Sequence, residues 1–146
     1  MDKRQTITVC AFIRDNGKVL IAKRAATKKF LPDKYELLGG HVEFGETPEE
    51  ALKRELIEEM KISIAVEMPF YAFTYLTDDN KTHCVEIDYF ARLEPADQEI
   101  KLNPEDHSEY RWITESEVSK YLDANDDERK AVEAGFSMFK KGHGIK

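Results

Sequence analysis

Three glutamates, Glu55, Glu58 and Glu59, are spaced so that a helix through them would carry their carboxylates on one face. No basic residue stands between them. Like charges at this spacing destabilise a helix by roughly 0.2–0.5 kcal/mol per pair, and a cation bound between them would reverse that sign. Such oxygen ligands suit Mg²⁺ or Mn²⁺ rather than a soft metal. Taken alone, the three acids are also what a solvated helix face carries.

A helix is strongly indicated for this stretch. Thr47 is suited to the N-cap, Pro48 to the first helical position, and Glu50 to the return bond of a capping box. The helix should end near Met60, and it carries an apolar stripe at helical spacing, made of Leu52, Leu56 and Met60. The glutamates are therefore predicted to lie on a capped amphipathic helix.

The wider segment from Gly40 to Ile62 resembles the signature box of the Nudix hydrolases, G-x5-E-x7-R-E-U-x-E-E-x-G-U with U apolar. Every position matches except Lys61, which stands where the box has its last glycine. A glycine just past a helix usually adopts the left-handed conformation, and lysine there costs on the order of 1 kcal/mol. Leu38 is a milder departure, because many relatives carry proline before the glycine pair. Neither change removes a metal ligand.

The resemblance implies an α/β fold, the Nudix-type α/β/α sandwich with a mixed β-sheet. It also implies a Mg²⁺ cofactor, with Mn²⁺ as a substitute, held by Glu55, Glu58, Glu59 and the backbone carbonyl of Gly39. Arg54 should pair with Glu46 and tie the loop to the helix, although an ordinary surface pair with Glu58 is the alternative. The pair Gly39-Gly40 permits close backbone approach before the box.

Further site residues are implied outside the box. Arg24 resembles an arginine that contacts substrate phosphates in the family, with Lys23 as the fallback. Either Glu55 or a second acid in the loop 103–109 would act as general base, and Glu109 is preferred there over Glu105.

Several other residues have two interpretations. His107 is expected at the surface and Trp112 in the core. The alternating aromatic residues of 71–75 are expected to be core more than a surface for base stacking. The acids Glu86 and Asp88 share one strand face, which would line either the substrate cleft or an exposed edge.

The remaining elements form a mixed pattern around the predicted helix. Strands are expected at 7–13, 19–24, 35–38, 64–76, 82–93 and 110–113, and helices at 115–122 and 127–140. Asn16-Gly17 indicates a hairpin between the first two strands, and the two long strands should pair around 78–80. The whole chain, 1–146, is one domain, with 139–146 expected to fray.

The composition of the chain limits the kinds of partner that it is expected to bind. The net charge of −7 argues against a nucleic-acid polymer or an anionic membrane, while a small nucleotide remains compatible because bound metal ions reverse the local field. The chain shows no signal peptide and no long apolar run, so the cytoplasm is the expected location. Cys10 and Cys84 are expected to be small buried thiols, and a homodimer is left open.

The predicted function is metal-dependent hydrolysis of a nucleoside diphosphate linked to another group. The leading substrate is a nucleoside triphosphate, oxidised or not, giving the monophosphate and pyrophosphate. ADP-ribose and dinucleoside polyphosphates are alternatives. A non-catalytic nucleotide-sensing domain is a weaker one, because such a domain would be expected to lose helix glutamates and this chain has them all.

Overall fold

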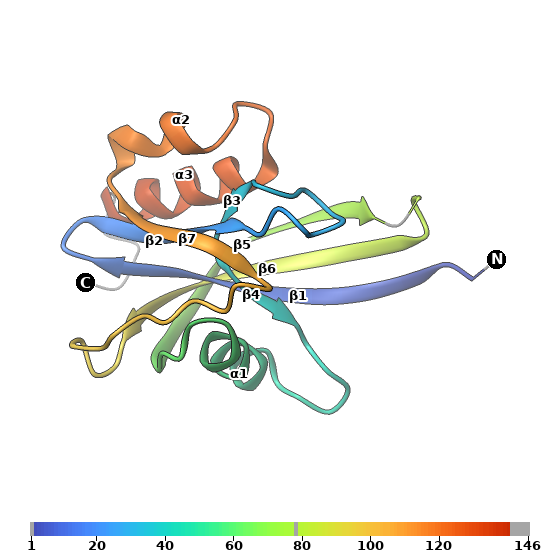
Figure 1. The fold of residues 1–146 in the computed structure, drawn as a ribbon, viewed down its shortest axis with the longest axis horizontal. Helices are drawn as coiled ribbons and strands as arrows, with labels where there is room; N and C mark the ends of the chain where they lie inside the picture. The colour runs from blue at the N-terminus through green and yellow to red at the C-terminus, as the bar shows by residue number, and fades with distance from the viewer. Residues whose placement is uncertain (1, 78, 141–146) are drawn as a thin grey trace.

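The computed structural model describes residues 2–77 and 79–140 as one β-sheet between two helical layers (Figure 1). Helix α1 (Pro48–Met60) covers one face of the sheet, and the short helix α2 (Val118–Tyr121) and α3 (Asp127–Lys140) lie on the other. The strands are β1 (Arg4–Asp15), β2 (Lys18–Arg24), β3 (Tyr35–Glu36), β4 (Leu38–His41), β5 (Ile64–Thr77), β6 (Thr82–Leu93) and β7 (His107–Ile113). The predicted α/β/α sandwich is confirmed.

Strand β1 is the centre of the sheet. Along one edge it pairs with β6 in parallel from Arg4 to Ile13. Its other edge is shared between β4, at Thr8–Ala11, and β2, which it meets only next to the Asn16-Gly17 turn. The long strands β5 and β6 pair antiparallel, as predicted, and β3 and β7 flank β2. The sheet is mixed because of the β1–β6 pairing, which no local pattern indicates.

Alternate residues of β1 enter two separate cores. Val9, Ala11 and Ile13 pack on the α1 side with the predicted helix stripe, Leu52, Leu56 and Met60. Cys10 and Phe12 face the other way and pack with Val132 and Phe136 of α3. This period-two alternation places a strand between two helical layers and orients the side chains next to the site.

Both ends of α1 have the predicted form. The Thr47 hydroxyl accepts from the Glu50 amide at 3.1 Å, and the Glu50 carboxylate accepts from the Thr47 amide at 2.9 Å. Lys61 adopts the left-handed conformation with φ 56° and ψ 35°, and its amide donates to the carbonyl of Ile57 at 3.0 Å. The helix therefore ends in the geometry that the missing glycine would have favoured.

Four details differ from the sequence prediction. The segment 35–38 forms two strands, since β3 pairs with β2 and β4 with β1. Strand β7 begins at His107, and the predicted helix 115–122 divides into a 3₁₀ turn (Glu115–Glu117) and α2. Phe139 and Lys140, predicted to fray, lie in α3, and the ring centroid of Phe139 is 4.6 Å from that of Phe90. The rest of that predicted tail, 141–146, lies outside the described residues.

Two expectations about the chain as a whole can also be compared with the structure. Cys10 and Cys84 are free and buried, as predicted. Among the described residues, every helix is too short or too polar to cross a bilayer.

Candidate active site

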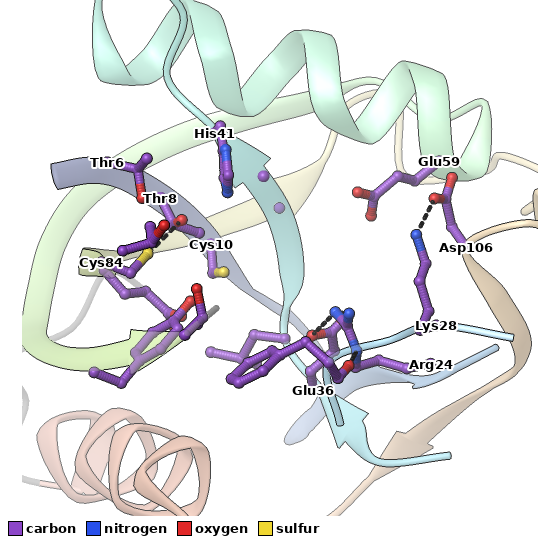
Figure 2. Close-up of a pocket in the computed structure, with 18 of the residues that line it drawn as sticks. Thr6, Thr8, Cys10, Arg24, Lys28, Glu36, His41, Glu59, Cys84 and Asp106 are labelled. Atoms are coloured by element: carbon purple, nitrogen blue, oxygen red, sulfur yellow. Dashed lines mark hydrogen bonds and ion pairs between the residues drawn. The ribbon is translucent and has the colours of Figure 1, made fainter. Parts of the chain in front are cut away.

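The glutamates of helix α1 point toward strand β4, which carries the first residue of the box. The Glu55 side chain is mostly buried, Glu59 is half-buried, and Glu58 is exposed. In Figure 2, Glu59 extends from the helix into the open space of a pocket. The three residues therefore lie on one helix face, and their exposure to solvent increases from Glu55 through Glu59 to Glu58.

The two glycines of β4 make room for different neighbours. A Cβ on Gly40 would lie 1.8 Å from Oε2 of Glu55, so the missing side chain leaves the space that the carboxylate fills. A Cβ on Gly39 would lie 1.8 Å from the backbone oxygen of Val9 in the neighbouring strand. A side chain at Gly39 would therefore clash with the neighbouring strand, and one at Gly40 would clash with Glu55 of the helix. The absence of both side chains lets the backbone of each glycine lie close to the site.

Arg54 joins the box loop to the helix as predicted. Its guanidinium makes two bonds to the Glu46 carboxylate, at 2.7 Å from Nε and 2.8 Å from Nη2, and a third to the carbonyl of His41 at 3.0 Å. The same group also contacts Glu58 at 3.2 Å, so the alternative surface pair coexists with the predicted one. The arginine lowers the pKa of Glu46 to about 2. This two-point pairing fixes the loop against the helix face that carries the three glutamates.

The charge state of the helix acids fits a cation site. Burial raises the pKa of Glu55 to about 7, with Arg54 opposing the shift and Glu58 adding to it. Burial and the neighbouring carboxylates of Glu36 and Glu55 raise the pKa of Glu59 to about 9. Oε1 of Glu59 is buried without a hydrogen-bond partner among the described residues. Crowded oxygen donors of this kind suit a hard divalent ion.

The pocket beside these acids encloses about 290 Å³. Its walls come from β1, β4, β6, the 25–34 loop and the end of β7, and its charged lining includes Arg24, Lys28, Glu36, Glu59 and Asp106 (Figure 2). A second pocket of about 360 Å³ shares Arg24, Glu36 and Tyr75 with it and extends toward α3. We call the two together the cleft. Its size suits a small molecule.

Basic side chains lie across the cleft from helix α1. Arg24, predicted to contact phosphates, lines both pockets and donates to the carbonyl of Phe30 at 2.9 Å and to Glu36 at 3.2 Å. Lys28 lines the first pocket and pairs with Asp106 at 3.0 Å. Lys23, the fallback, instead lies over the ring of Tyr35. The structure therefore brings Arg24, and not Lys23, to the cleft.

The loop predicted to supply a second acid brings Asp106, rather than Glu109 or Glu105, to the first pocket. Glu109 accepts from the Tyr35 hydroxyl and from Arg111 and does not line either pocket, and Glu105 is exposed. Asp106 lines the pocket instead. The cause is an irregularity where β7 meets β2, which pairs Arg24 with His107 and Lys23 with Glu109. The family motif does not extend to this loop, and no local signal in the sequence reveals the irregularity.

Among the other predictions for single residues, some agree with the structure and some do not. His107 is buried, not at the surface, and its Nε2 lies 2.9 Å from the Glu36 carboxylate. Trp112 packs against the core on the α1 side, as expected. The aromatic residues of 71–75 are half-buried rather than core: Phe73 and Tyr75 line the cleft, and Tyr75 stacks on Phe30 with centroids 5.8 Å apart.

Glu86 and Asp88 lie inside the molecule, so the exposed-edge interpretation is wrong. Glu86 is 4% exposed and lines the cleft, while Asp88 beneath it is fully buried. Their carboxylates and the Cys10 sulfur form a group that could hold a metal ion. Glu128 of α3, which the sequence did not single out, joins them from the opposite layer.

Comparison with known proteins agrees with this geometry. The family model of the NUDIX domain matches residues 3–134. The nucleoside triphosphatase NudI of Escherichia coli O139:H28 (strain E24377A / ETEC) is 32% identical, over 88% of this chain and 95% of that protein. NudI of Shigella flexneri is similar to the same extent.

Solved structures show the same fold. A MutT protein from Methanosarcina mazei Go1 superposes with a TM-score of 0.79 at 21% identity, over 97% of this chain and 99% of that one. The E. coli ORF135 protein gives a TM-score of 0.72 at 23% identity, over 95% and 94% of the two chains.

The chain therefore belongs to the Nudix hydrolase family. It is a pyrophosphohydrolase, an enzyme that cleaves phosphoanhydride bonds in small nucleotide substrates.

Proposed function

We propose that this enzyme hydrolyses a nucleoside triphosphate to the monophosphate and pyrophosphate in a Mg²⁺-dependent reaction. One observation carries the proposal: Glu59 of α1 and the basic groups Arg24 and Lys28 line the same cleft, with Arg24 across it from the helix. A polyphosphate requires both kinds of group, because a bound metal ion neutralises the negative charge on one side of the phosphate chain and cationic side chains neutralise it on the other. The likeness to the nucleoside triphosphatase NudI supports the choice of substrate.

The metal site is proposed to consist of Glu55, Glu58, Glu59 and the backbone carbonyl of Gly39. Mn²⁺ has the same ligand preference and should substitute. When bound, the ion supplies charge neutralisation and polarises a phosphoryl oxygen. The Arg54–Glu46 pair holds these ligands in place, since it fixes the loop that precedes the helix.

The basic wall is proposed to bind the phosphate oxygens. Arg24 is occupied by Glu36 and the Phe30 carbonyl, and the ring of Phe30 lies 5.9 Å from its guanidinium carbon. These contacts orient the guanidinium toward the cleft, so a phosphate oxygen can join or replace the bond to Glu36. Lys28, held by Asp106, is placed to meet the next phosphate.

We propose Glu55 as the acceptor of the proton from the attacking water. It lies against Gly40 at the cleft margin, whereas Glu109 is engaged by Tyr35 and Arg111 and lines neither pocket. The nucleobase is proposed to stack in the second part of the cleft, against the aromatic surface formed by Phe30 and by Phe73 and Tyr75 of β5.

A substrate screen tests the proposal. Purified protein with Mg²⁺ is incubated separately with nucleoside triphosphates, 8-oxo-dGTP, ADP-ribose and dinucleoside polyphosphates, and the products are separated. Release of pyrophosphate and nucleoside monophosphate from at least one triphosphate, abolished by EDTA and restored by Mg²⁺ or Mn²⁺, is expected. Turnover confined to ADP-ribose or dinucleoside polyphosphates would overturn the choice of substrate, and binding of every nucleotide without cleavage would indicate a sensing domain.

A further inference from the structure

A second group of possible metal ligands lies away from helix α1, on the cleft floor. The Cys10 sulfur of β1 and carboxylate oxygens of Glu86 and Asp88 on β6 all lie within 4.8 Å of one another. The register explains the grouping, since the parallel ladder pairs Thr8 with Glu86 and Cys10 with Asp88. Side chains two residues apart on paired strands point to the same face of the sheet. That face is the one covered by α3.

These carboxylates lack the partners that buried acids require. Asp88 is fully buried, and no N–H or hydroxyl group of the described residues donates to either of its oxygens; its carboxyl contacts that of Glu86. Oε2 of Glu86 is also without a partner. Glu128 enters from α3 with 9% exposure; its Oε2 accepts from the Leu37 amide at 2.9 Å, and its Oε1 has no partner. Four buried carboxylate oxygens are therefore available to accept a hydrogen bond or to bind a cation.

The charges that surround these buried carboxylates do not neutralise them. Burial raises the pKa of Glu86 and of Glu128 well above the usual range, and the acids around them push the pKa values further up. Glu36 contributes to this repulsion from β3. Among the described residues, no ion pair joins a lysine or arginine to Glu86, Asp88 or Glu128; Arg24, a basic group on the cleft wall, is paired with Glu36. Burying acids without a partner is costly, so the group must hold either protons or a cation.

The donor atoms select the kind of cation. Mg²⁺ and Ca²⁺ take oxygen ligands and avoid sulfur, while Zn²⁺ accepts thiolate and carboxylate together. Two ligands bound to one Zn²⁺ at 2.0–2.3 Å in tetrahedral geometry lie roughly 3.3–3.8 Å apart. The separations of up to 4.8 Å require only a small inward rotation of the side chains.

We propose that Cys10, Glu86 and Asp88 form a metal site for Zn²⁺ or a similar borderline-soft divalent ion, separate from the Mg²⁺ site on α1. Cys10 and Glu86 line the cleft, which gives the ion an entry path (Figure 2). The fourth position is open to water or to the free oxygen of Glu128. The bound ion neutralises the floor of the cleft and cross-links β1 to β6, so it stabilises the fold. The inference does not depend on the substrate.

Cobalt absorption spectroscopy tests the site directly, because only a thiolate ligand gives the near-ultraviolet charge-transfer band of a sulfur–Co²⁺ bond. Full-length protein is first saturated with Mg²⁺ to fill the α1 site and then titrated with Co²⁺. One equivalent of Co²⁺ with a thiolate band, displaced by Zn²⁺, is expected. The chain has two cysteines, so the band must come from one of them or from both.

The two cysteines provide a matched pair of variants. Cys10→Ser should abolish the thiolate band, while Cys84→Ser should keep it, although Cys84 is equally buried and also lines the cleft. Asp88→Asn should weaken Co²⁺ and Zn²⁺ at least tenfold, and Zn²⁺ should raise the melting temperature of wild type but not of Cys10→Ser. Cys10→Ala replaces the serine variant if that protein fails to fold.

Three results would overturn the site. The first is folded wild type that gives no thiolate band, which would mean that the acids hold protons only. The second is a band lost in Cys84→Ser and kept in Cys10→Ser. The third is a Zn²⁺ affinity that Asp88→Asn leaves unchanged.

Discussion

Gly40 and Glu55 occupy complementary space: a Cβ atom on the glycine would lie 1.8 Å from Oε2 of the glutamate. The strand and the helix of the box meet at this point, 15 residues apart in sequence. The neighbouring Gly39 meets backbone instead, with its hypothetical Cβ 1.8 Å from the carbonyl oxygen of Val9. Two adjacent glycines therefore serve two separate purposes: Gly40 makes room for the Glu55 carboxylate and Gly39 permits the close approach of β1.

Gly40→Ala should impair catalysis while leaving the fold intact. The added methyl group displaces the end of a flexible side chain, so Glu55 moves and the sheet stays. We expect turnover to fall at least 100-fold and Mg²⁺ to bind more weakly, with a melting temperature close to wild type. Gly39→Ala is the contrast, because it must shift backbone and should cost more than ~2 kcal/mol of stability. Equal losses of stability in the two variants would contradict the assignment.

Arg54→Lys should reduce activity more than stability. Lysine keeps the charge but cannot reproduce the two parallel bonds to Glu46 or the bond to the His41 carbonyl. The loop should loosen, and kcat should fall more than tenfold with little change in melting temperature. Arg129→Lys, which alters an exposed helix pair with Glu133, is the control. Wild-type kcat in Arg54→Lys would show that the pairing does not position the site.

Lys61→Gly should be neutral to stabilising, by up to about 1 kcal/mol. The lysine holds φ 56°, a region that costs a side-chain-bearing residue energy and costs glycine none. Lys61→Ala keeps the strain and removes the exposed side chain, so it should bring no such gain. Chemical denaturation of the three proteins measures the difference. A clear loss of stability in Lys61→Gly would show that the strain is compensated by contacts of the lysine.

The buried acids should make the protein less stable as pH rises from about 5 to 8. Burial raises the folded-state pKa of Asp88 to about 8, and those of Glu86 and Glu128 are also raised. The native state therefore keeps protons that the unfolded chain has released, and stability falls with pH by up to about 1.4 kcal/mol per unit for each such proton. Above the folded-state pKa values the slope disappears.

Urea denaturation at several pH values, in the presence of EDTA, measures this slope. Asp88→Asn removes one of the titrating groups, so its slope should be shallower than that of wild type. Identical slopes in the two proteins would show that Asp88 is ionised in the folded state throughout this range.

Features encoded within the box could be predicted from the sequence. The helix from Pro48 to Met60, its Thr47 cap and the Arg54–Glu46 pair all depend on residues within one short segment, where spacing determines which side chains meet. Lys61 illustrates the same point, since it has the left-handed conformation expected just after the helix, although the box has glycine there.

Features that depend on pairing between distant strands could not be predicted. The irregularity between Lys23 and Arg24 decides that Asp106 and His107, rather than Glu109, approach the cleft. The acidic floor requires the parallel β1–β6 register and the packing of α3 over it, which bring Glu128 to Glu86. Neither arrangement leaves a periodic signal in one strand, because it is set by tertiary packing.

The central claim is that the α1 carboxylates hold the divalent ion that cleavage requires. The most direct test compares pyrophosphate release by wild type and Glu59→Gln, at matched protein and across a range of Mg²⁺ concentrations, with circular dichroism to verify the fold. The account predicts a folded Glu59→Gln protein whose turnover is at least 100-fold lower, with Mg²⁺ affinity reduced. Near-normal, Mg²⁺-dependent release by folded Glu59→Gln would contradict it.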